Sequence, residues 1–171
     1  MKTIMIIFAV ALLLPFQAEA QLDTTTSYKV VVDYSESMDR MIAKGSYEGV
    51  HPWITRKHFP IIGSGREEAE VFFFVLADTE VFDLNQIRRD IDSAGCFPVN
   101  LAVLLALGAT YQQLQKQFYI FSIAQSWEVA DGMQAVVALS FGEIGRNLDC
   151  DVHDGSWMDN RRIAVIRKPK K

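Results

Sequence analysis

Three side chains with oxygen atoms follow the first β-like run of the sequence at alternate positions, Asp33, Ser35 and Ser37. The run itself, residues 28–33, is rich in valine and predicts a strand, and a short helical pattern follows it. Carboxylate and hydroxyl oxygens at such a turn are ligands for a hard divalent cation. Serine oxygens also cap helices by accepting backbone N–H groups of the first turn. Metal binding by all three residues is therefore one hypothesis, and capping by Ser35 or Ser37 is the other.

The spacing D-x-S-x-S from Asp33 to Ser37 resembles the start of the metal-ion adhesion site in von Willebrand factor A domains. The resemblance implies a cation that grips a partner, with a Thr and an Asp added from later loops of a doubly wound parallel sheet. The later predicted strand that ends in an acid reaches Asp78, 45 residues after Asp33 (78 − 33), which leaves too few crossover units. The second half of the chain is mostly β, without helices to cover a parallel sheet. A metal-ion-dependent adhesion module is therefore the alternative function.

A second set of metal-ligand types lies in the stretch LDCDVHDGSWMDN, residues 148–160. Cys150 and His153 have C-x-x-H spacing, and Asp151 and Asp154 flank them, which are residue types that zinc accepts. No second pair follows at ligand spacing, so a polar turn with Asp154 and Gly155 at its corner is the favoured interpretation. We expect no cofactor.

Catalytic patterns are absent from the sequence. It contains no G-x-S-x-G and no recognisable Cys/His frame, and its three histidines have no signature spacing. Whether the protein is an enzyme stays open, but these absences favour a protein that acts by binding. A hydrolase with an unrecognised site is a further alternative.

Three tryptophans, Trp53, Trp127 and Trp157, lie in or beside predicted loops. Exposed indoles can stack on sugars or anchor a protein partner, whereas buried ones plug the core beneath a loop. We select Trp127 and Trp157 as candidate binding residues for an unknown protein or glycan ligand.

The first 20 residues have the pattern of a secretory signal peptide. Lys2 supplies a positive start, residues 4–14 are apolar, and Ala18-Glu19-Ala20 is an A-x-A cleavage signal. The apolar run is shorter than the roughly 20 residues that a membrane span needs; a buried core helix is the alternative. We expect cleavage near Ala20, an exported protein (periplasmic or secreted), and no stable membrane anchor.

Charge and cysteine content restrict the partners and the compartment. The chain has a net charge of −4, and its last eleven residues contain six basic residues. Residues 21–160 therefore carry a net charge of −10. Such an acidic body argues against a nucleic-acid partner. Cys96 and Cys150 are the two cysteines; in an oxidising compartment the even count suggests a possible disulfide between them, and two buried free thiols are the slightly preferred interpretation.

The predicted elements form an α+β fold with a mixed or antiparallel sheet, two to three helices and a C-terminal half that is mostly β. Helices are expected to begin after Ser37, Asp83 and Asn100, the last of them apolar all round. We expect a polar lead-in over residues 21–27, a single domain over 28–168 and a basic tail over 169–171. The strands are predicted at residues 28–33, 69–77, 118–124, 134–141, 146–152 and 162–167.

Several segments, spread over about residues 30–168, resemble in order a family of short uncharacterised bacterial proteins. They are MIAKGSYEGV, ITRKHFPI, DIDSAGCFPVNLAVLLALGATYQQLQKQF, IAQSW and RRIAVIRK. The family pattern reads G..P..L.ELLALGA.YP.LQ..FPI.ALGS.W and ends in RFLAVRK. In that pattern the position of Asp33 is usually not acidic, which also favours the capping interpretation. The resemblance brings no function with it, so the sequence predicts an exported, small, non-catalytic binding protein of unknown ligand.

Overall fold

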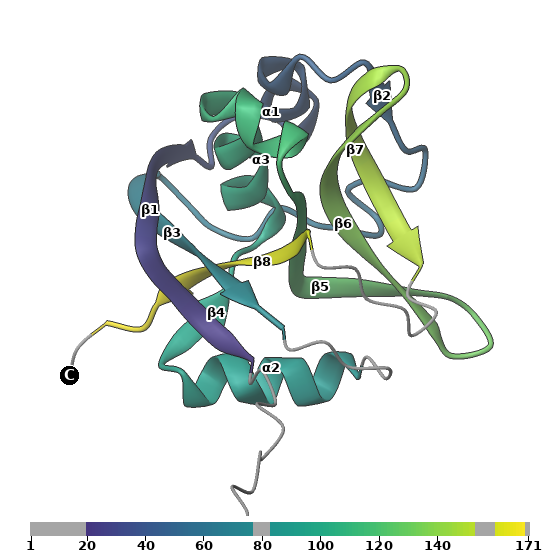
Figure 1. Cartoon of the computed structure of the whole chain (residues 1–171). Coiled ribbons are helices and arrows are strands. Elements are labelled where there is room, and N and C mark those ends of the chain that lie inside the picture. Colours follow the sequence, from purple (N-terminus) through teal and green to yellow (C-terminus); the bar gives the residue numbers. More distant parts are fainter. Residues whose placement is uncertain (1–19, 77–82, 153–159, 170–171) are drawn as a thin grey trace, which may run out of the picture.

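Strands and short helices are interspersed in the first half of the chain, and strands dominate from residue 119 onward (Figure 1). The computed structural model describes residues 20–76, 83–152 and 160–169. The elements within these ranges are β1 (Gln21–Asp33), α1 (Met38–Gly45), β2 (Gly49–Val50), β3 (Arg66–Val75), α2 (Leu84–Ser93), β4 (Cys96–Pro98), α3 (Leu101–Thr110), the 3-10 helix η1 (Gln112–Lys116), β5 (Tyr119–Ala130), β6 (Met133–Gly142), β7 (Gly145–Val152) and β8 (Arg161–Arg167).

Within the described residues, the strands form one mixed sheet of eight in the order β1-β3-β8-β5-β6-β7-β2, with β4 paired to β8. Neighbours run antiparallel except β5 with β8 and β2 with β7, which run parallel. The predicted single α+β domain, with a mixed sheet and a C-terminal half made mostly of strands, is confirmed. The sheet is not the doubly wound parallel sheet that the adhesion-site resemblance implies.

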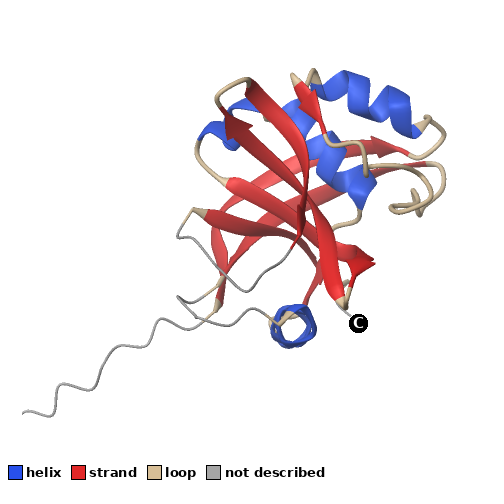
Figure 2. Ribbon diagram, turned by 90° about the vertical axis from the view of Figure 1, so that its right-hand side faces the viewer, coloured by secondary structure: helices blue, strands red, loops and turns tan. Residues whose placement is uncertain are grey.

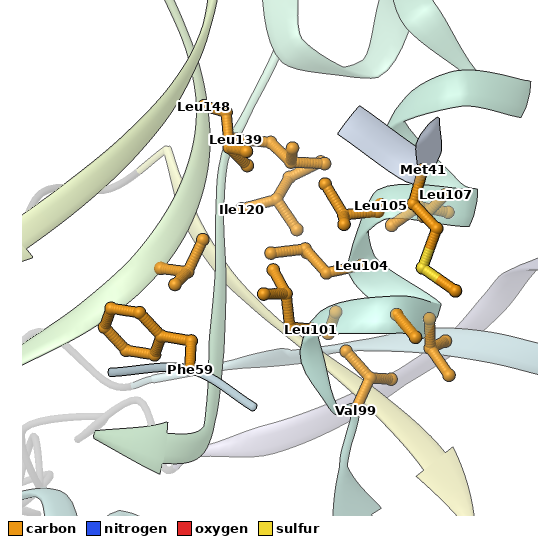
Figure 3. Close-up of a cluster of buried hydrophobic side chains, with 14 of the residues drawn as sticks. Met41, Phe59, Val99, Leu101, Leu104, Leu105, Leu107, Ile120, Leu139 and Leu148 are labelled. Carbon is orange, nitrogen blue, oxygen red and sulfur yellow. The ribbon is translucent and has the colours of Figure 1, made fainter. Parts of the chain in front are cut away.

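The sheet separates two hydrophobic cores, because successive side chains of a strand point to opposite faces. The main core lies under α1 and α3 and includes Val30, Phe73, Ile120 and Leu139; Figure 3 shows the leucines of α3 packed into it. The second core lies under α2 on the other face (Figure 2). Helices therefore cover both faces of the single sheet, α1 and α3 on one face and α2 on the other.

Helix α3 is the buried helix that the sequence predicts. Seven of its ten residues are buried. The helix therefore packs against the sheet on one side and against other elements around the rest of its circumference. No helix among the described residues has the length and apolar character needed to cross a membrane.

The strands extend beyond the sequence prediction at several places. Residues 21–23, predicted as part of a polar lead-in, pair with residues 73–75 of β3, and a bulge joins them to the pairing that resumes at Tyr28. Strand β3 begins at Arg66, three residues before the strand predicted from residue 69. Strands β2 and β4 lie outside the six predicted strands. Backbone pairing with distant partners sets the bounds of these extra strands.

The possible Cys96–Cys150 disulfide is not present, and both residues are buried free thiols. The physical reason is the position of the sheet between them: Cys96 belongs to the second core and Cys150 to the main core.

Candidate functional site

A cleft of about 410 Å³ lies where the last residues of β1 meet α1 and α3. These three elements pack together at one end of the molecule (Figure 1). The floor of the cleft is apolar, and two acidic and two basic side chains stand around it. Its lining residues are Val31, Val32, Asp33, Glu36, Met41, Lys44, Arg66, Ala102, Leu105, Ala106, Ala109 and Thr110.

The floor is formed largely by one face of α3. Ala102, Leu105, Ala106 and Ala109 follow each other at helical spacing, so they share that face. Met41 of α1, itself buried, contributes from the neighbouring helix. Three alanines on a helix face leave space that larger side chains would fill, and this keeps the cleft open.

The D-x-S-x-S residues form the turn from β1 into α1 at the rim of this cleft. One carboxylate oxygen of Asp33, Oδ1, accepts hydrogen bonds from the backbone N–H of Ser35 at 3.0 Å and from its hydroxyl at 2.5 Å. These bonds, the hydroxyl first, hold the pKa of Asp33 below its usual value. The hydroxyl of Ser37 accepts from the backbone N–H of Arg40 at 3.2 Å and so caps α1. The predicted capping role is confirmed for Ser37.

Two cations and one further acid complete the rim. Glu36 is ion-paired with both Lys44 and Arg40, the latter at 3.3 Å. Arg66 occupies the position on β3 directly opposite Asp33 on β1. Its guanidinium makes no hydrogen bond or ion pair with any other described residue, Asp33 included. The charges near the cleft thus comprise the ion-paired set around Glu36 and the cross-strand neighbours Asp33 and Arg66, whose positions point to the face of the sheet opposite Val32.

The predicted binding residue Trp127 lies in an aromatic cluster away from this cleft. The ring of His58 stacks on Trp127 with centroids 3.8 Å apart, and Trp53 meets Trp127 edge-on at 5.1 Å. His51 in turn packs against Trp53. Both tryptophans are partly buried against the main core, so the cluster fastens the loop after β2 to β5. The other predicted binding residue, Trp157, lies outside the described residues.

The zinc-ligand candidates are only partly described. Cys150 is buried, and this burial, followed by the charges of Asp151 and Asp149, raises the pKa of its thiol to about 11. Asp151 is ion-paired with Arg161 at 3.6 Å. His153 and Asp154 lie outside the described residues. Within the described ranges, no three His, Cys, Asp or Glu side chains come together as a metal site requires, at Asp33 or elsewhere.

Sequence reasoning found Asp33 but missed the rest of the cleft. Arg66 lies before the strand predicted at residues 69–77, and its position opposite Asp33 depends on strand pairing across about thirty residues of chain. The alanines of α3 gave no signal beyond helix burial. The one available signal was the acid at Asp33 itself, at the end of an apolar strand.

No family model, curated protein or solved structure matches this chain. The resemblance to short bacterial proteins therefore stays a prediction, and function has to be argued from the site.

Proposed function

We propose that this chain is an exported binding protein that acts without catalysis and takes a small ligand in the cleft between β1, α1 and α3. The observation that carries the proposal is a concavity whose lining combines apolar residues of β1, α1 and α3 with four charged residues. Ligand pockets have volumes of about 300–1,000 Å³, a range that includes the cleft's volume of about 410 Å³. The signal-peptide pattern of residues 1–20 supports export.

The aromatic cluster around Trp127 gives weaker support for binding than the cleft does. His58 covers one face of the Trp127 ring, and that face is no longer open to a sugar or a partner side chain. A protein or glycan contact at Trp127 and Trp157 stays a prediction beside the cleft.

The cleft is tested by filling it. Ala106→Trp places an indole on the floor, and Ala109→Leu fills a smaller part of the same space. The probes are four small molecules, hexanol, hexanoate, hexylamine and L-leucine, followed by ligand-observed NMR. We expect at least one probe to bind the unmodified protein, to bind Ala109→Leu more weakly and to lose binding to Ala106→Trp.

The matched control is Ala43→Trp, the same substitution on an exposed helical alanine that does not line the cleft. It should bind the probe as the unmodified protein does. Binding that survives in Ala106→Trp, or failure of all four probes, would overturn the cleft as the ligand site.

Export is tested separately by the intact mass of protein recovered from the exported fraction. A chain beginning at Gln21 is expected, and an uncleaved chain in that fraction would contradict the signal-peptide interpretation.

A further inference from the structure

We infer that the ligand of the cleft is a short extended peptide, bound as an added strand on the free edge of β1. The inference rests on the proposed function and names the ligand class for that same site. It follows from three features, which are the position of the cleft at the edge of the sheet, the outward backbone groups of Val31 and the closure of this edge at both ends.

The first feature is the position of the cleft. Within the described residues β1 pairs with β3 alone and stands at one end of the strand order, so its other edge has no neighbouring strand (Figure 1). The cleft is lined both by Val31, which is 46% exposed, and by Val32, which is buried. Successive side chains of a strand point to opposite faces, so a cleft that both residues line opens at the edge between the two faces. A ligand in the cleft therefore meets the backbone of β1 from the side.

The second feature is the direction of the backbone groups of β1. The N–H of Tyr34 donates to the carbonyl of Gly65 at 2.8 Å, and this bond continues the register in which β1 pairs with β3. In an antiparallel pair, hydrogen-bonded and non-hydrogen-bonded residue pairs alternate. The even-numbered residues of β1 that precede Tyr34 therefore bond to β3. The backbone groups of the odd-numbered residues from Lys29 to Asp33 point to the open edge.

The third feature is the closure of this edge at both ends. The carbonyl of Lys29 accepts a hydrogen bond from the hydroxyl of Tyr111 at 3.1 Å, and the carbonyl of Asp33 accepts one from the backbone N–H of Glu36 at 3.2 Å. Val31 lies between them, and its outward N–H and C=O form no hydrogen bond with another described residue. An added strand can use both groups of Val31, but the Tyr111 side chain and the turn at Glu36 limit it to about three residues.

These features specify the ligand's backbone and side chains. In antiparallel pairing, one ligand residue opposite Val31 exchanges both N–H···O=C bonds with it, and its side chain lies on the exposed face of Val31. The side chains before and after it point to the other face, toward buried Val32 and the α3 alanines Ala102 and Ala106. Main-chain bonds to a sheet edge supply affinity, and alternate side chains supply specificity. The expected ligand is therefore apolar at its first and third residues and polar or apolar at the middle one.

The decisive experiment is NMR titration of acetyl-Val-Ser-Val-amide and three related peptides. Acetyl-Ser-Val-Ser-amide exchanges the positions of the apolar and polar side chains. N-methylation of the middle residue removes the donor for the Val31 carbonyl, and N-methylation of the third residue alters an N–H that points away from β1. We expect the first peptide to bind, and the exchanged and middle-methylated peptides to bind about tenfold or more weakly. The peptide methylated at its third residue should bind within about threefold of the unmethylated one.

A proline variant tests the same bonds from the side of the protein. Proline lacks the N–H and is accepted on edge strands where that N–H faces outward, so Val31→Pro should fold, which its melting temperature checks. It should weaken acetyl-Val-Ser-Val-amide about tenfold. Lys29→Pro is the matched control, because it removes an outward N–H of the same strand outside the cleft, and it should bind the peptide normally. Should Val31→Pro fail to fold, the two N-methylated peptides decide the question with the unmodified protein.

Two further measurements exclude other occupants of the edge. A nine-residue peptide with the same three central residues should bind no more tightly; a tenfold gain would assign the edge to a segment of a larger protein and overturn the inference. Sedimentation should give the same mass for the unmodified protein and Val31→Pro. A dimer that Val31→Pro abolishes would assign the edge to a second copy of this chain.

The outcomes distinguish this inference from the proposed function. If hexanol or hexanoate binds in a manner that Ala106→Trp abolishes, but the peptides do not bind or bind equally well with either N-methyl group, the cleft is a ligand site and the peptide assignment is wrong. If acetyl-Val-Ser-Val-amide binds equally well to Ala106→Trp, both are wrong.

Discussion

At the residue scale, the guanidinium of Arg146 is a buried charge whose hydrogen-bond acceptors are neutral groups. The residue is 7% exposed. Its Nη2 donates to the carbonyl of Gly108 at 2.6 Å and to Oε1 of Gln115 at 2.6 Å, its Nη1 donates to the carbonyl of Gly45, and the ring of Tyr47 lies 5.1 Å from its Cζ. Gly45 ends α1, and Gly108 lies in the last turn of α3. The negative ends of two helix dipoles therefore face the charge.

Replacement of Arg146 should unfold the protein more readily. Arg146→Met leaves the acceptors at Gly45, Gly108 and Gln115 buried without donors, and we expect a loss of about 3 kcal/mol in the free energy of unfolding. Arg146→Lys should recover only part of it, because an ammonium lacks the planar fork. Urea denaturation measures both. Arg56→Met, at an exposed loop arginine, should change the free energy by less than about 0.5 kcal/mol; an Arg146→Met variant of normal stability would show that the guanidinium does not hold these elements together.

Residue-scale prediction succeeded where the partner is local. Ser37 and Asn100 bond to N–H groups three residues ahead, so their capping is visible in sequence. Arg146 was assigned only to the start of a strand, because its partner Gly45 lies 101 residues away. Gln86 shows a local failure. Its position predicts a capping box with Asp83, but its amide bonds to Asp90 and Arg89 instead.

At the scale of elements, Asn100 connects the start of α3 to the chain that precedes β3. Its side-chain oxygen accepts from the backbone N–H of Val103 at 3.0 Å and caps the helix. Its amide nitrogen donates to the carbonyl of Ile62 at 3.0 Å and to the hydroxyl of Tyr34 at 3.2 Å. Tyr34 belongs to the turn after β1. The side chain of Asn100 therefore fixes the orientation of α3, which forms the floor of the cleft, relative to the turn at the rim of the cleft.

Loss of Asn100 should therefore cost more than loss of an ordinary cap. We expect Asn100→Ala to lower the free energy of unfolding by about 2 kcal/mol, against about 1 kcal/mol for Ser37→Ala, which removes a cap alone. Asn100→Ser keeps a capping oxygen but cannot reach Ile62 or Tyr34, so it should fall between the unmodified protein and Asn100→Ala. Chemical denaturation of the three variants gives the order. Equal losses for Asn100→Ala and Ser37→Ala would mean that the bonds to Ile62 and Tyr34 contribute nothing.

Element boundaries were predictable where local signals are strong, as at the start of α3 after Asn100. In the β5–β6 hairpin the predicted strand end at residue 124 is wrong, because β5 runs to Ala130. At the tip of that hairpin, Asp131 and Gly132 have φ values of 50° and 79°, the backbone that its Asp-Gly sequence predicts. Boundaries set by distant pairing were not predictable. Gln21 and Arg66 lie in strands paired with β3 and β1; the three threonines at 24–26 favour a strand, whereas the Gly-Ser-Gly before Arg66 does not.

At the scale of the whole molecule, the α+β class followed from the order of the elements, but the cleft did not. It arises from contacts among β1, α1 and α3 and from the pairing that sets Arg66 opposite Asp33. A single sequence shows which residues are apolar or charged, and it does not show which of them meet. The two-sided sheet has a second consequence for the whole molecule, since it keeps the two cysteines in separate cores.

Both thiols should consequently be unreactive in the folded protein and reactive once it unfolds. Burial raises the pKa of Cys96, and burial followed by the charges of Asp151 and Asp149 raises the pKa of Cys150 to about 11. At about pH 8, roughly one Cys150 side chain in a thousand is the thiolate that attacks a disulfide reagent. Ellman's reagent should react slowly with native protein and at once with two thiols per chain in urea. A native mass two daltons below the reduced mass would contradict the separation of the cores.

The same shift makes stability depend on pH in a defined window. The folded state prefers the protonated thiol of Cys150, so its contribution to stability is complete below the unfolded pKa of about 8.5. The contribution is lost as the pH rises from there through the folded value of about 11. Cys150→Ser cannot ionise in this range, and its melting temperature should fall less steeply between about pH 8.5 and pH 10.5 than that of the unmodified protein. Cys96→Ser, which leaves Cys150 in place, should keep that part of the pH dependence. Parallel curves for Cys150→Ser and the unmodified protein would mean that the thiol at β7 ionises as freely in the folded state as in the unfolded one.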